Sequence, residues 1–486
     1  MRTIIDGLRE LAADNRTVLV DGAHRVAGAT LHDEARALAT HLAGCLPRGS
    51  VVSFMLPNWS EAAVVYLGAL LAGMVVNPIL PSLRERELTF ILADANCRMI
   101  FIPKEFRGHD YAAMLARVAA AMDTPPETVV VRGDAPPMLG AAPGNFSAVA
   151  PDDPALLLYT SGTSGRAKGV LHSHNSIGAL IAQLRDHWLI EPGDTFLVPS
   201  PIAHIGGSIY AFECPLLLGT TAVLMERWNA DDAVALMVAE RCTHMAGATP
   251  FLEQILDAAE RAGTRLPDLK VFICGGASVP PSLIRRATAY FDRAKVSRVY
   301  GSTEVPVTTV GALDDADAAA DTDGRPGIAD IRLVEGEIRV RGPQMLLGYR
   351  HAEDESHDSE GYFRTGDLGR WAGDCLVVTG RVKDIIVRNG ENIAPKEVED
   401  ILIGHPGIAE IAIVGLPDER TGERACAVIV PSSGPRPGLD QMRIFLTQKG
   451  IARFKIPEQV EIWDALPKND AGKILKHQIR ARLTCR

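Results

Sequence analysis

One glycine-, serine- and threonine-rich stretch of the sequence carries groups suited to phosphate chemistry. It reads YTSGTSGRAKG, begins at Tyr159 and directly follows an apolar run at 155–158. A strand that enters such a loop presents backbone N–H groups and hydroxyls to phosphate oxygens, and Lys168 adds a positive charge. A Walker P-loop is excluded because Ala167 and Gly169 flank this lysine, where that motif needs Gly and Ser or Thr. By itself the stretch is equally compatible with a glycine-rich turn that binds nothing.

Four further stretches favour a nucleotide site. YGSTE places Glu304 beside a hydroxyl and a glycine after a predicted strand, which suits Mg²⁺ and phosphate. YFRTGDLG offers Asp367 as an acceptor for ribose hydroxyls. A long motif, GRVKDIIVRNGENIAPKEVE, begins at Gly380, and LPKNDAGKILK carries Lys473 on a glycine-flanked loop. Taken singly, these residues are also compatible with a surface carboxylate, a turn cap and a solvated lysine.

In their order and spacing, the five stretches resemble the core motifs of the adenylate-forming superfamily. Its members are acyl-CoA synthetases, the amino-acid-activating domains of peptide synthetases, and firefly-type luciferases. The resemblance covers essentially the whole chain. It implies that a carboxylic acid reacts with ATP to give an acyl-adenylate and pyrophosphate, and that a thiol then takes the acyl group and releases AMP. ATP, Mg²⁺ and coenzyme A are the implied cofactors.

The resemblance also implies a role for each matched residue. The residues expected to hold the β- and γ-phosphates are Thr160, Ser161, Gly162, Thr163, Ser164, Gly165 and Lys168. Those expected at the adenine and the ribose are Gly276, Ala277, Tyr300, Asp367 and Arg381. Mg²⁺ is expected on Thr163 and Glu304, with Thr303 on the α-phosphate. Lys473 is expected to bridge the carboxylate, the ribose and the α-phosphate, so Lys473, Glu304 and Thr303 are the implied catalytic residues.

The second half-reaction implies a moving C-terminal domain. The hinge of the family falls on Lys383, a position that must absorb a large change of φ and ψ. Rotation there withdraws the Lys473 loop and presents a tunnel for the thiol. The tunnel residues implied are Arg388, Asn389 and Gly390, although Gly390 also fits a plain hairpin turn.

The acyl pocket is expected around PIAHIGGSIYAF. The resemblance places His204 at the carboxylate, with a core histidine as the alternative. We expect Gly206 and Gly207 to leave room for the acyl group and Val305 to add an apolar wall. Between residues 200 and 212 no aspartate is present to pair with an α-amino group, which disfavours an amino acid. The pocket is expected to take an uncharged, fairly bulky acyl group.

Stretches such as MLPNW and NPILPSLRERELTFIL resemble ligases for medium-chain, alicyclic or steroid side-chain carboxylates. Only thirteen residues follow Lys473, so we expect no fused carrier domain and favour free CoA as the acceptor. One alternative is an acyl-AMP ligase that loads a separate carrier protein. The other is a non-catalytic nucleotide-binding regulator, which would have no need to keep Lys473.

The elements that must position these residues follow from the sequence pattern. Short apolar runs alternate with amphipathic helical patterns, which predicts an α/β fold with largely parallel sheets. We expect a large N-terminal multi-layer α/β domain, 1–380, that forms the adenylation core, and a small mobile C-terminal α+β domain, 381–486. In the small domain we expect strands near Ile385, Ile411 and Ala427. Its expected helices span 395–403 and 439–449, and a surface loop is expected at 311–327.

Composition excludes several functional classes. The 486 residues carry 50 basic and 60 acidic side chains, a net charge of −10, which argues against nucleic acid as a partner. The eight cysteines form no zinc-type cluster and indicate buried thiols in a reducing compartment. The N-terminus does not resemble a signal peptide, and the apolar run 62–76 is too short to span a membrane. We expect a cytoplasmic protein without a transmembrane segment, and a homodimer as its assembly.

Overall fold

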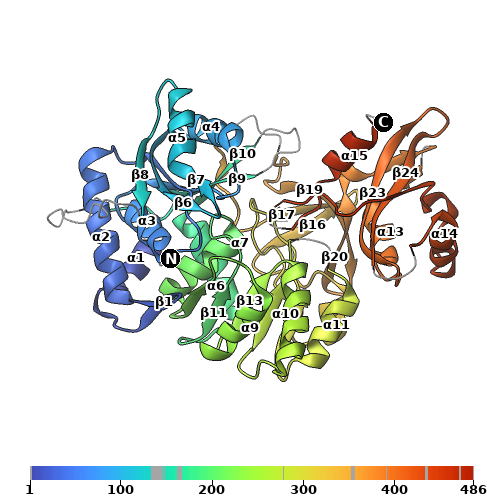
Figure 1. Cartoon of the computed structure of the whole chain (residues 1–486), viewed down its shortest axis with the longest axis horizontal. Coiled ribbons are helices and arrows are strands. Elements are labelled where there is room, and N and C mark those ends of the chain that lie inside the picture. Colours follow the sequence, from blue (N-terminus) through green and yellow to red (C-terminus); the bar gives the residue numbers. More distant parts are fainter. Residues whose placement is uncertain are drawn as a thin grey trace.

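The computed structural model describes residues 3–132, 146, 148–160, 167–276, 279–351, 356–389, 391–432, 436–469 and 472–484. The chain forms a large lobe from its N-terminal part and a small lobe from its C-terminal part, drawn in orange and red in Figure 1. The large lobe contains two seven-stranded sheets and a four-stranded sheet, and the small lobe contains a five-stranded sheet. The predicted α/β fold with a large N-terminal and a small C-terminal domain is confirmed.

The first seven-stranded sheet has the order β15-β14-β13-β11-β12-β1-β2 and is parallel except for the β1–β2 hairpin. Its strands are β1 (Thr17–Asp21), β2 (His24–Ala27), β11 (Thr195–Val198), β12 (Thr221–Leu224), β13 (His244–Gly247), β14 (Val271–Cys274) and β15 (Lys295–Arg298). The helices that follow them along the chain are α9 (Ala230–Ala239), α10 (Thr249–Ala262) and α11 (Pro281–Tyr290). Parallel strands must be joined by such crossovers, so the predicted alternation of strand and helix is confirmed.

The second seven-stranded sheet has the order β18-β10-β9-β4-β3-β5-β8. Its strands are β3 (Val51–Phe54), β4 (Val75–Pro78), β5 (Cys97–Pro103), β8 (Glu127–Val131), β9 (Pro154–Thr160), β10 (Lys168–Ser173) and β18 (Gly348–Tyr349). The neighbouring helices are α1 (Ile4–Glu10), α2 (Gly28–Cys45), α3 (Ser60–Leu71), α4 (Glu85–Asp94), α5 (Tyr111–Ala120) and α6 (His174–His187). Every residue of β3 and β4 is buried, as expected for central strands covered on both faces.

The remaining sheets carry the site residues of the C-terminal third. The four-stranded sheet is antiparallel and contains β16 (Asp330–Val334), β17 (Glu337–Arg341), β19 (Phe363–Ala372) and β20 (Cys375–Arg381). The small lobe contains β21 (Ile386–Arg388), β22 (Glu391–Ile393), β23 (Ile408–Asp418), β24 (Gly422–Pro431) and β25 (Gln459–Ile462). Its helices are α13 (Pro395–Leu402), α14 (Leu439–Gln448) and α15 (Lys476–Thr484). The strands and helices predicted for this part of the chain are confirmed.

Two expectations from the sequence are corrected. The segment 311–327 is not a continuous loop, because it contains the short helix α12 (Ala316–Asp321), whose Ala319 and Ala320 are buried. Small alanine side chains allow this helix to pack closely, and the Asp315 side chain accepts from its first N–H groups. Among the described cysteines, six are buried as expected, but Cys45 is exposed.

The apolar run 62–76 forms most of α3 and the start of β4 inside the large lobe. Within the described residues, no helix combines the length and apolar character needed to cross a membrane.

Candidate active site

The predicted phosphate loop connects the antiparallel strands β9 and β10. Thr160 pairs with Lys168 in the register of this hairpin, so the two strands close the loop at its base. The ammonium of Lys168 lies 4.8 Å from the centre of the Tyr349 ring, on the neighbouring strand β18. Several predicted site residues lie outside the described part of the chain: Ser161, Gly162, Thr163, Ser164, Gly165, Ala277 and Gly390.

Glu304 lies opposite the phosphate hairpin. The Tyr349 hydroxyl donates a hydrogen bond of 3.1 Å to Oε1 of Glu304. Tyr349 therefore touches both predicted phosphate-site residues, the cation Lys168 and the carboxylate Glu304. The sequence analysis missed Tyr349, because only the pairing of β18 with β10 brings this tyrosine to the site.

The loop that carries Thr303 and Glu304 is tightly folded. A Cβ atom on Gly301 would lie 2.6 Å from the backbone nitrogen of Val307, so only glycine fits there. The Ser302 hydroxyl accepts from the backbone N–H of Val305 at 3.1 Å. The loop thus has a fixed shape before any ligand binds.

The predicted ribose corner is held by charged hydrogen bonds. Asp367 faces Arg381 across the β19–β20 hairpin, and Arg381 Nε lies 2.8 Å from Asp367 Oδ1. The Tyr300 hydroxyl donates to Asp367 Oδ2, also at 2.8 Å. Burial, together with the charge of Asp367, raises the pKa of Tyr300 well above its usual value, so this hydroxyl stays protonated. A carboxylate has about four acceptor positions, so Asp367 retains capacity for ribose hydroxyls.

Lys473 reaches this corner from the small lobe. Its backbone N–H donates to the Asn469 side chain at 2.8 Å, within a turn where Gly472 has φ +77°. A Cβ on Gly472 would lie 3.8 Å from Pro250 of the large lobe, so the loop is docked against the start of α10. Burial and the nearby guanidinium of Arg381 lower the pKa of the Lys473 ammonium to about 8.

His204 lies at the same junction. Its ring Nδ1 accepts a 3.1 Å hydrogen bond from the backbone N–H of Gly206, at the start of α7 (Ile205–Ser208). The surrounding protein atoms and the ammonium of Lys473 lower the pKa of His204. The structure therefore brings together Lys473, His204 and the Asp367–Arg381 pair, residues that are up to about 270 positions apart in the sequence.

One expectation about the acyl pocket is corrected. Gly207 does not leave room for a ligand, because a Cβ there would lie 2.3 Å from the carbonyl oxygen of Pro201. Its role is close packing of backbone against backbone. Val305 is buried in the apolar cluster beneath the four-stranded sheet, together with Val170 and Val340, and its place in the wall of the acyl pocket stays a prediction. Gly206 has open space beyond the His204 ring.

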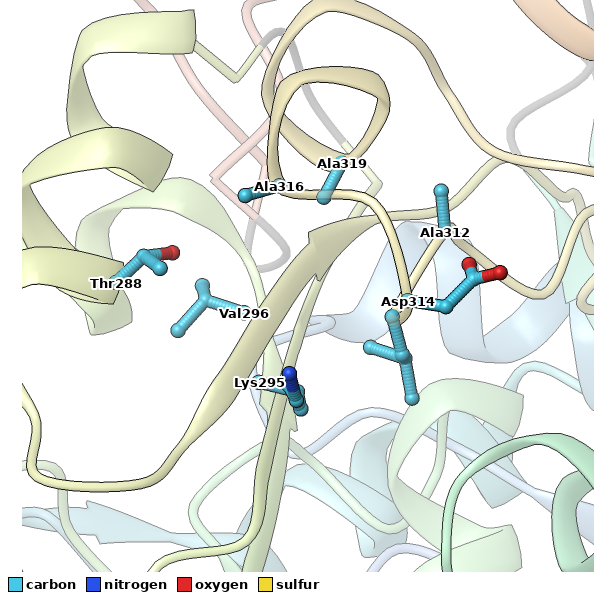
Figure 2. Close-up of a pocket in the computed structure, with 8 residues that line it drawn as sticks. Thr288, Lys295, Val296, Ala312, Asp314, Ala316 and Ala319 are labelled. Carbon is cyan, nitrogen blue, oxygen red and sulfur yellow. The ribbon is translucent and has the colours of Figure 1, made fainter.

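A small cavity of about 40 Å³ adjoins His204 and Thr303. Its other lining residues are Pro78, Ile79, Leu80, Leu83, Ile91, Leu158, Tyr159, Ala203 and Ile205, most of them apolar. The N-terminal part of this lining was not predicted, because it comes from the segment after β4, which carries no motif for chemistry. The hollow in Figure 2 is larger, at about 110 Å³, but it is lined by β15, α11 and the α12 region and contains no predicted site residue. We assign it no role.

The predicted hinge residue lies between the lobes, and the described thiol-tunnel residues lie within the small lobe. Lys383 is exposed in the short 3₁₀ segment η3 (Val382–Asp384), which joins β20 to β21. Arg388 donates two hydrogen bonds, of 2.8 and 2.7 Å, to the Glu458 carboxylate. Asn389 has φ +50° and donates its backbone N–H to the carbonyl oxygen of Thr421 at 2.8 Å. These contacts remain inside the small lobe.

A metal ion at this site would need ligands from the substrate in addition to those of the described protein residues. Among the described residues, no group of three or more His, Cys, Asp or Glu side chains is arranged to hold a metal ion. Glu304 is a single half-buried carboxylate beside the phosphate hairpin. This arrangement fits Mg²⁺, which commonly binds one or two carboxylates and completes its shell with phosphates and water.

The fold and the site define a class of enzyme that activates its substrate with a nucleotide. The family model for AMP-binding enzymes matches residues 10–350, and the model for the C-terminal domain of these enzymes matches residues 397–473. The chain therefore belongs to the AMP-binding enzyme family, the adenylate-forming enzymes that its five motifs resemble.

Relatives and solved structures agree with this membership. The medium-chain fatty-acid–CoA ligase of Escherichia coli is 34% identical over 481 residues, covering 90% of this chain and 84% of the relative. An octahydro-indenylpropanoyl:CoA ligase of Rhodococcus jostii is 32% identical over 499 residues, covering 96% and 95%. The crystal structure of ATP-bound MatB from Rhodopseudomonas palustris has a TM-score of 0.88 at 26% identity and covers 99% of both chains. Other relatives are an AMP ligase and an acyl-carrier-protein ligase.

Proposed function

We propose that the protein is an AMP-forming acid–CoA ligase. In the first step a carboxylate oxygen attacks the α-phosphate of ATP and pyrophosphate leaves. In the second step the thiol of CoA attacks the acyl carbon, and AMP leaves with the acyl-oxygen bond broken. The observation that carries this proposal is the docking of the Lys473 loop beside Asp367 and Arg381, at the junction of the lobes.

The described residues divide the first step among them. Two anions must approach each other, so positive charge and hydrogen-bond donors have to be in place beforehand. Lys168 and the hairpin loop hold the terminal phosphates, and Thr303 contacts the α-phosphate. Lys473 supplies its ammonium to the carboxylate and the α-phosphate as charge develops there.

The nucleoside end is held by the large lobe. Asp367 and Arg381 bind the ribose hydroxyls, and Tyr300 and the open backbone at Gly276, with φ +82°, flank the adenine. Glu304 would hold Mg²⁺ together with the phosphates, and the metal would neutralise phosphate charge.

Free CoA is the acceptor that we favour. Two of the relatives named above are CoA ligases, which supports CoA as the acceptor. The cavity beside His204 and Thr303 is mostly apolar, which supports an apolar acyl group beside them. For the second step, rotation at Lys383 would withdraw Lys473 and bring Arg388 and Asn389 to the path of the thiol. The acid that we propose is an apolar medium-chain, alicyclic or steroid side-chain carboxylate, as the names of the relatives suggest.

The test is pyrophosphate release with ATP and Mg²⁺ across a panel of carboxylic acids, with and without CoA. We expect acid-dependent release that CoA accelerates, with AMP and a thioester as products. Release that stops near one turnover with or without CoA would instead identify an acyl-AMP ligase that needs a carrier protein. No release with any acid would contradict the proposed activity and favour a nucleotide-binding regulator.

A further inference from the structure

His172 is a fully buried histidine on β10, the strand that leaves the phosphate hairpin. Its ring Nε2 lies 2.7 Å from the backbone carbonyl oxygen of Thr303, and its Nδ1 lies 3.2 Å from the hydroxyl of Ser176. The two residues bonded through Nε2 are 131 positions apart in the sequence. This contact directly joins the strand of one nucleotide motif to the loop of another.

The chemistry of the partners determines the proton position on the ring. A backbone carbonyl can only accept, so Nε2 must carry the proton and donate. Nδ1 is then an acceptor and faces the Ser176 hydroxyl, whose single proton is within reach of both Nδ1, at 3.2 Å, and the Ser173 carbonyl oxygen, at 3.1 Å. Complete burial lowers the pKa of His172 to about 4, so the ring is neutral near pH 7.

The bonded carbonyl belongs to the peptide unit between Thr303 and Glu304. Because a peptide unit is planar, fixing its carbonyl also fixes the direction in which the following N–H and the two flanking Cα atoms point. The side chains of Thr303 and Glu304 are attached to those two Cα atoms. On the other side, Tyr349 holds the Glu304 carboxylate directly. His172 thus restrains the backbone between Thr303 and Glu304, and Tyr349 restrains the Glu304 side chain.

We propose that His172 is a positioning residue for the adenylation step: through its Nε2–H it orients the Thr303–Glu304 peptide so that Thr303 and Glu304 face the triphosphate and Mg²⁺. The inference rests on the proposed function. It predicts that the donor at this position matters, rather than the volume of the ring.

The experiment compares two substitutions at each of two neighbouring buried histidines. His172→Leu removes the donor at similar volume, whereas His172→Gln retains an N–H group that can reach the Thr303 carbonyl. His174 is the matched control, because it is 1% exposed, and its Nδ1 has no hydrogen-bond partner among the described residues. The same Leu and Gln changes are made there. The readouts are kcat for acid-dependent pyrophosphate release, the Mg²⁺ concentration for half-maximal rate, and Tm.

We expect His172→Leu to lower kcat by roughly 10- to 100-fold and to raise the half-maximal Mg²⁺ concentration, because displacement of catalytic groups by about 1 Å has effects of this size. His172→Gln should recover most of the loss, to within about fivefold of wild type. At position 174 the Leu and Gln variants should resemble each other, and neither should change the Mg²⁺ dependence.

Equal losses in His172→Leu and His172→Gln, or a lower Tm with unchanged Mg²⁺ dependence, would overturn the inference. Calorimetric titration with MgATP keeps this result separate from the proposed function. If wild type binds MgATP but activates no acid, the proposed function fails, and the inference still requires weaker MgATP binding in His172→Leu that His172→Gln restores. If wild type does not bind MgATP, both fail.

Discussion

Asp367 on the large lobe and Lys473 on the small lobe meet at one site, but they are held in different ways. Oδ1 of Asp367 accepts from the Arg381 guanidinium and Oδ2 accepts from the Tyr300 hydroxyl. The Asp367 side chain is only 7% exposed. Lys473 is fixed through its backbone, by the Asn469 side chain. Within the described residues, its ammonium has no hydrogen bond or ion pair.

The difference concerns when each group makes its strongest interactions. Asp367 has an opposite charge at 2.8 Å, whereas burial beside Arg381 lowers the pKa of Lys473. Under the proposed function, the ribose corner is therefore already hydrogen-bonded before ATP binds, while the lysine gains its full interaction only when negative charge develops beside it. Interactions that strengthen in the transition state raise kcat. A group without ground-state partners can also leave the site easily for a second step.

Removing Lys473 should give the largest effect. Lys473→Ala is expected to reduce adenylation by about 10²–10³-fold, because a donor to developing charge is lost, while thiolysis of supplied acyl-adenylate is largely retained. Lys468→Ala is the matched control, since this nearby lysine pairs with Glu410 at 2.8 Å. Equal loss of both half-reactions in Lys473→Ala would contradict the proposal that Lys473 acts only in adenylation and leaves the site for the second step.

Asp367→Asn should give the second-largest effect. Asp367→Asn removes the charge that Arg381 and Tyr300 contact, and hydrogen bonds to charged groups contribute about 1.5–3 kcal/mol each. We expect kcat/KM for ATP to fall by roughly 10- to 100-fold, with both half-reactions affected through nucleotide binding. Asp374→Asn on the same hairpin, whose side chain pairs with Arg325 at the surface, is the control. A change confined to kcat would argue against a ground-state role for Asp367.

Restricting the backbone between the lobes tests whether the small lobe must rotate at Lys383 to withdraw Lys473. Lys383→Pro restricts φ in the η3 segment and should slow thioester formation by about tenfold while sparing adenylation, because only the second step needs the rotated lobe. Lys383→Ala removes the side chain but leaves the backbone free, and it should behave like wild type. The measurement is single-turnover adenylation followed by thiolysis. If both steps slow together in Lys383→Pro, Lys383 is not the hinge.

The charge state of Lys473 predicts a pH dependence. A folded-state pKa of about 8 means that the ammonium form predominates below pH 8 and is lost above it. We expect kcat/KM for adenylation, which reports the free enzyme, to fall tenfold per pH unit well above pH 8. A plateau extending to pH 10 would show that Lys473 keeps its ordinary pKa and that the site does not disfavour its charge.

Tyr349→Phe should have the smallest effect. The ring beneath Lys168 remains, and the variant loses one 3.1 Å hydrogen bond to Glu304. A partly exposed hydrogen bond of this kind contributes about 1 kcal/mol, so we expect roughly a fivefold loss of rate, accompanied by a higher Mg²⁺ requirement. Tyr349→Ala, which also removes the ring, should be worse. If Phe and Ala behave alike, the hydroxyl is the only part of Tyr349 that matters.

Much of the fold and part of the site could be predicted from the sequence. Alternating apolar runs and helical patterns are local signals, so they predicted the α/β layers and the strands and helices of the small lobe. The motifs around Lys168, Glu304, Asp367 and Lys473 are also local, because their glycines and polar residues lie within a few positions of one another. The order of these motifs along the chain identified the family.

Tertiary structure alone decided which residues meet. Tyr349 and His172 carry no motif of their own. Tyr349 is brought to the site by the pairing of β18 with β10, and His172 by the packing of β10 against the loop that carries Thr303. Gly207 is a packing residue because the Pro201 carbonyl folds back onto it, and the local sequence does not encode that distance. The lowered pKa of Lys473 likewise requires the docked small lobe. Composition and spacing determine the chemistry available to a chain, whereas burial and charge pairing depend on distances that only the folded arrangement creates.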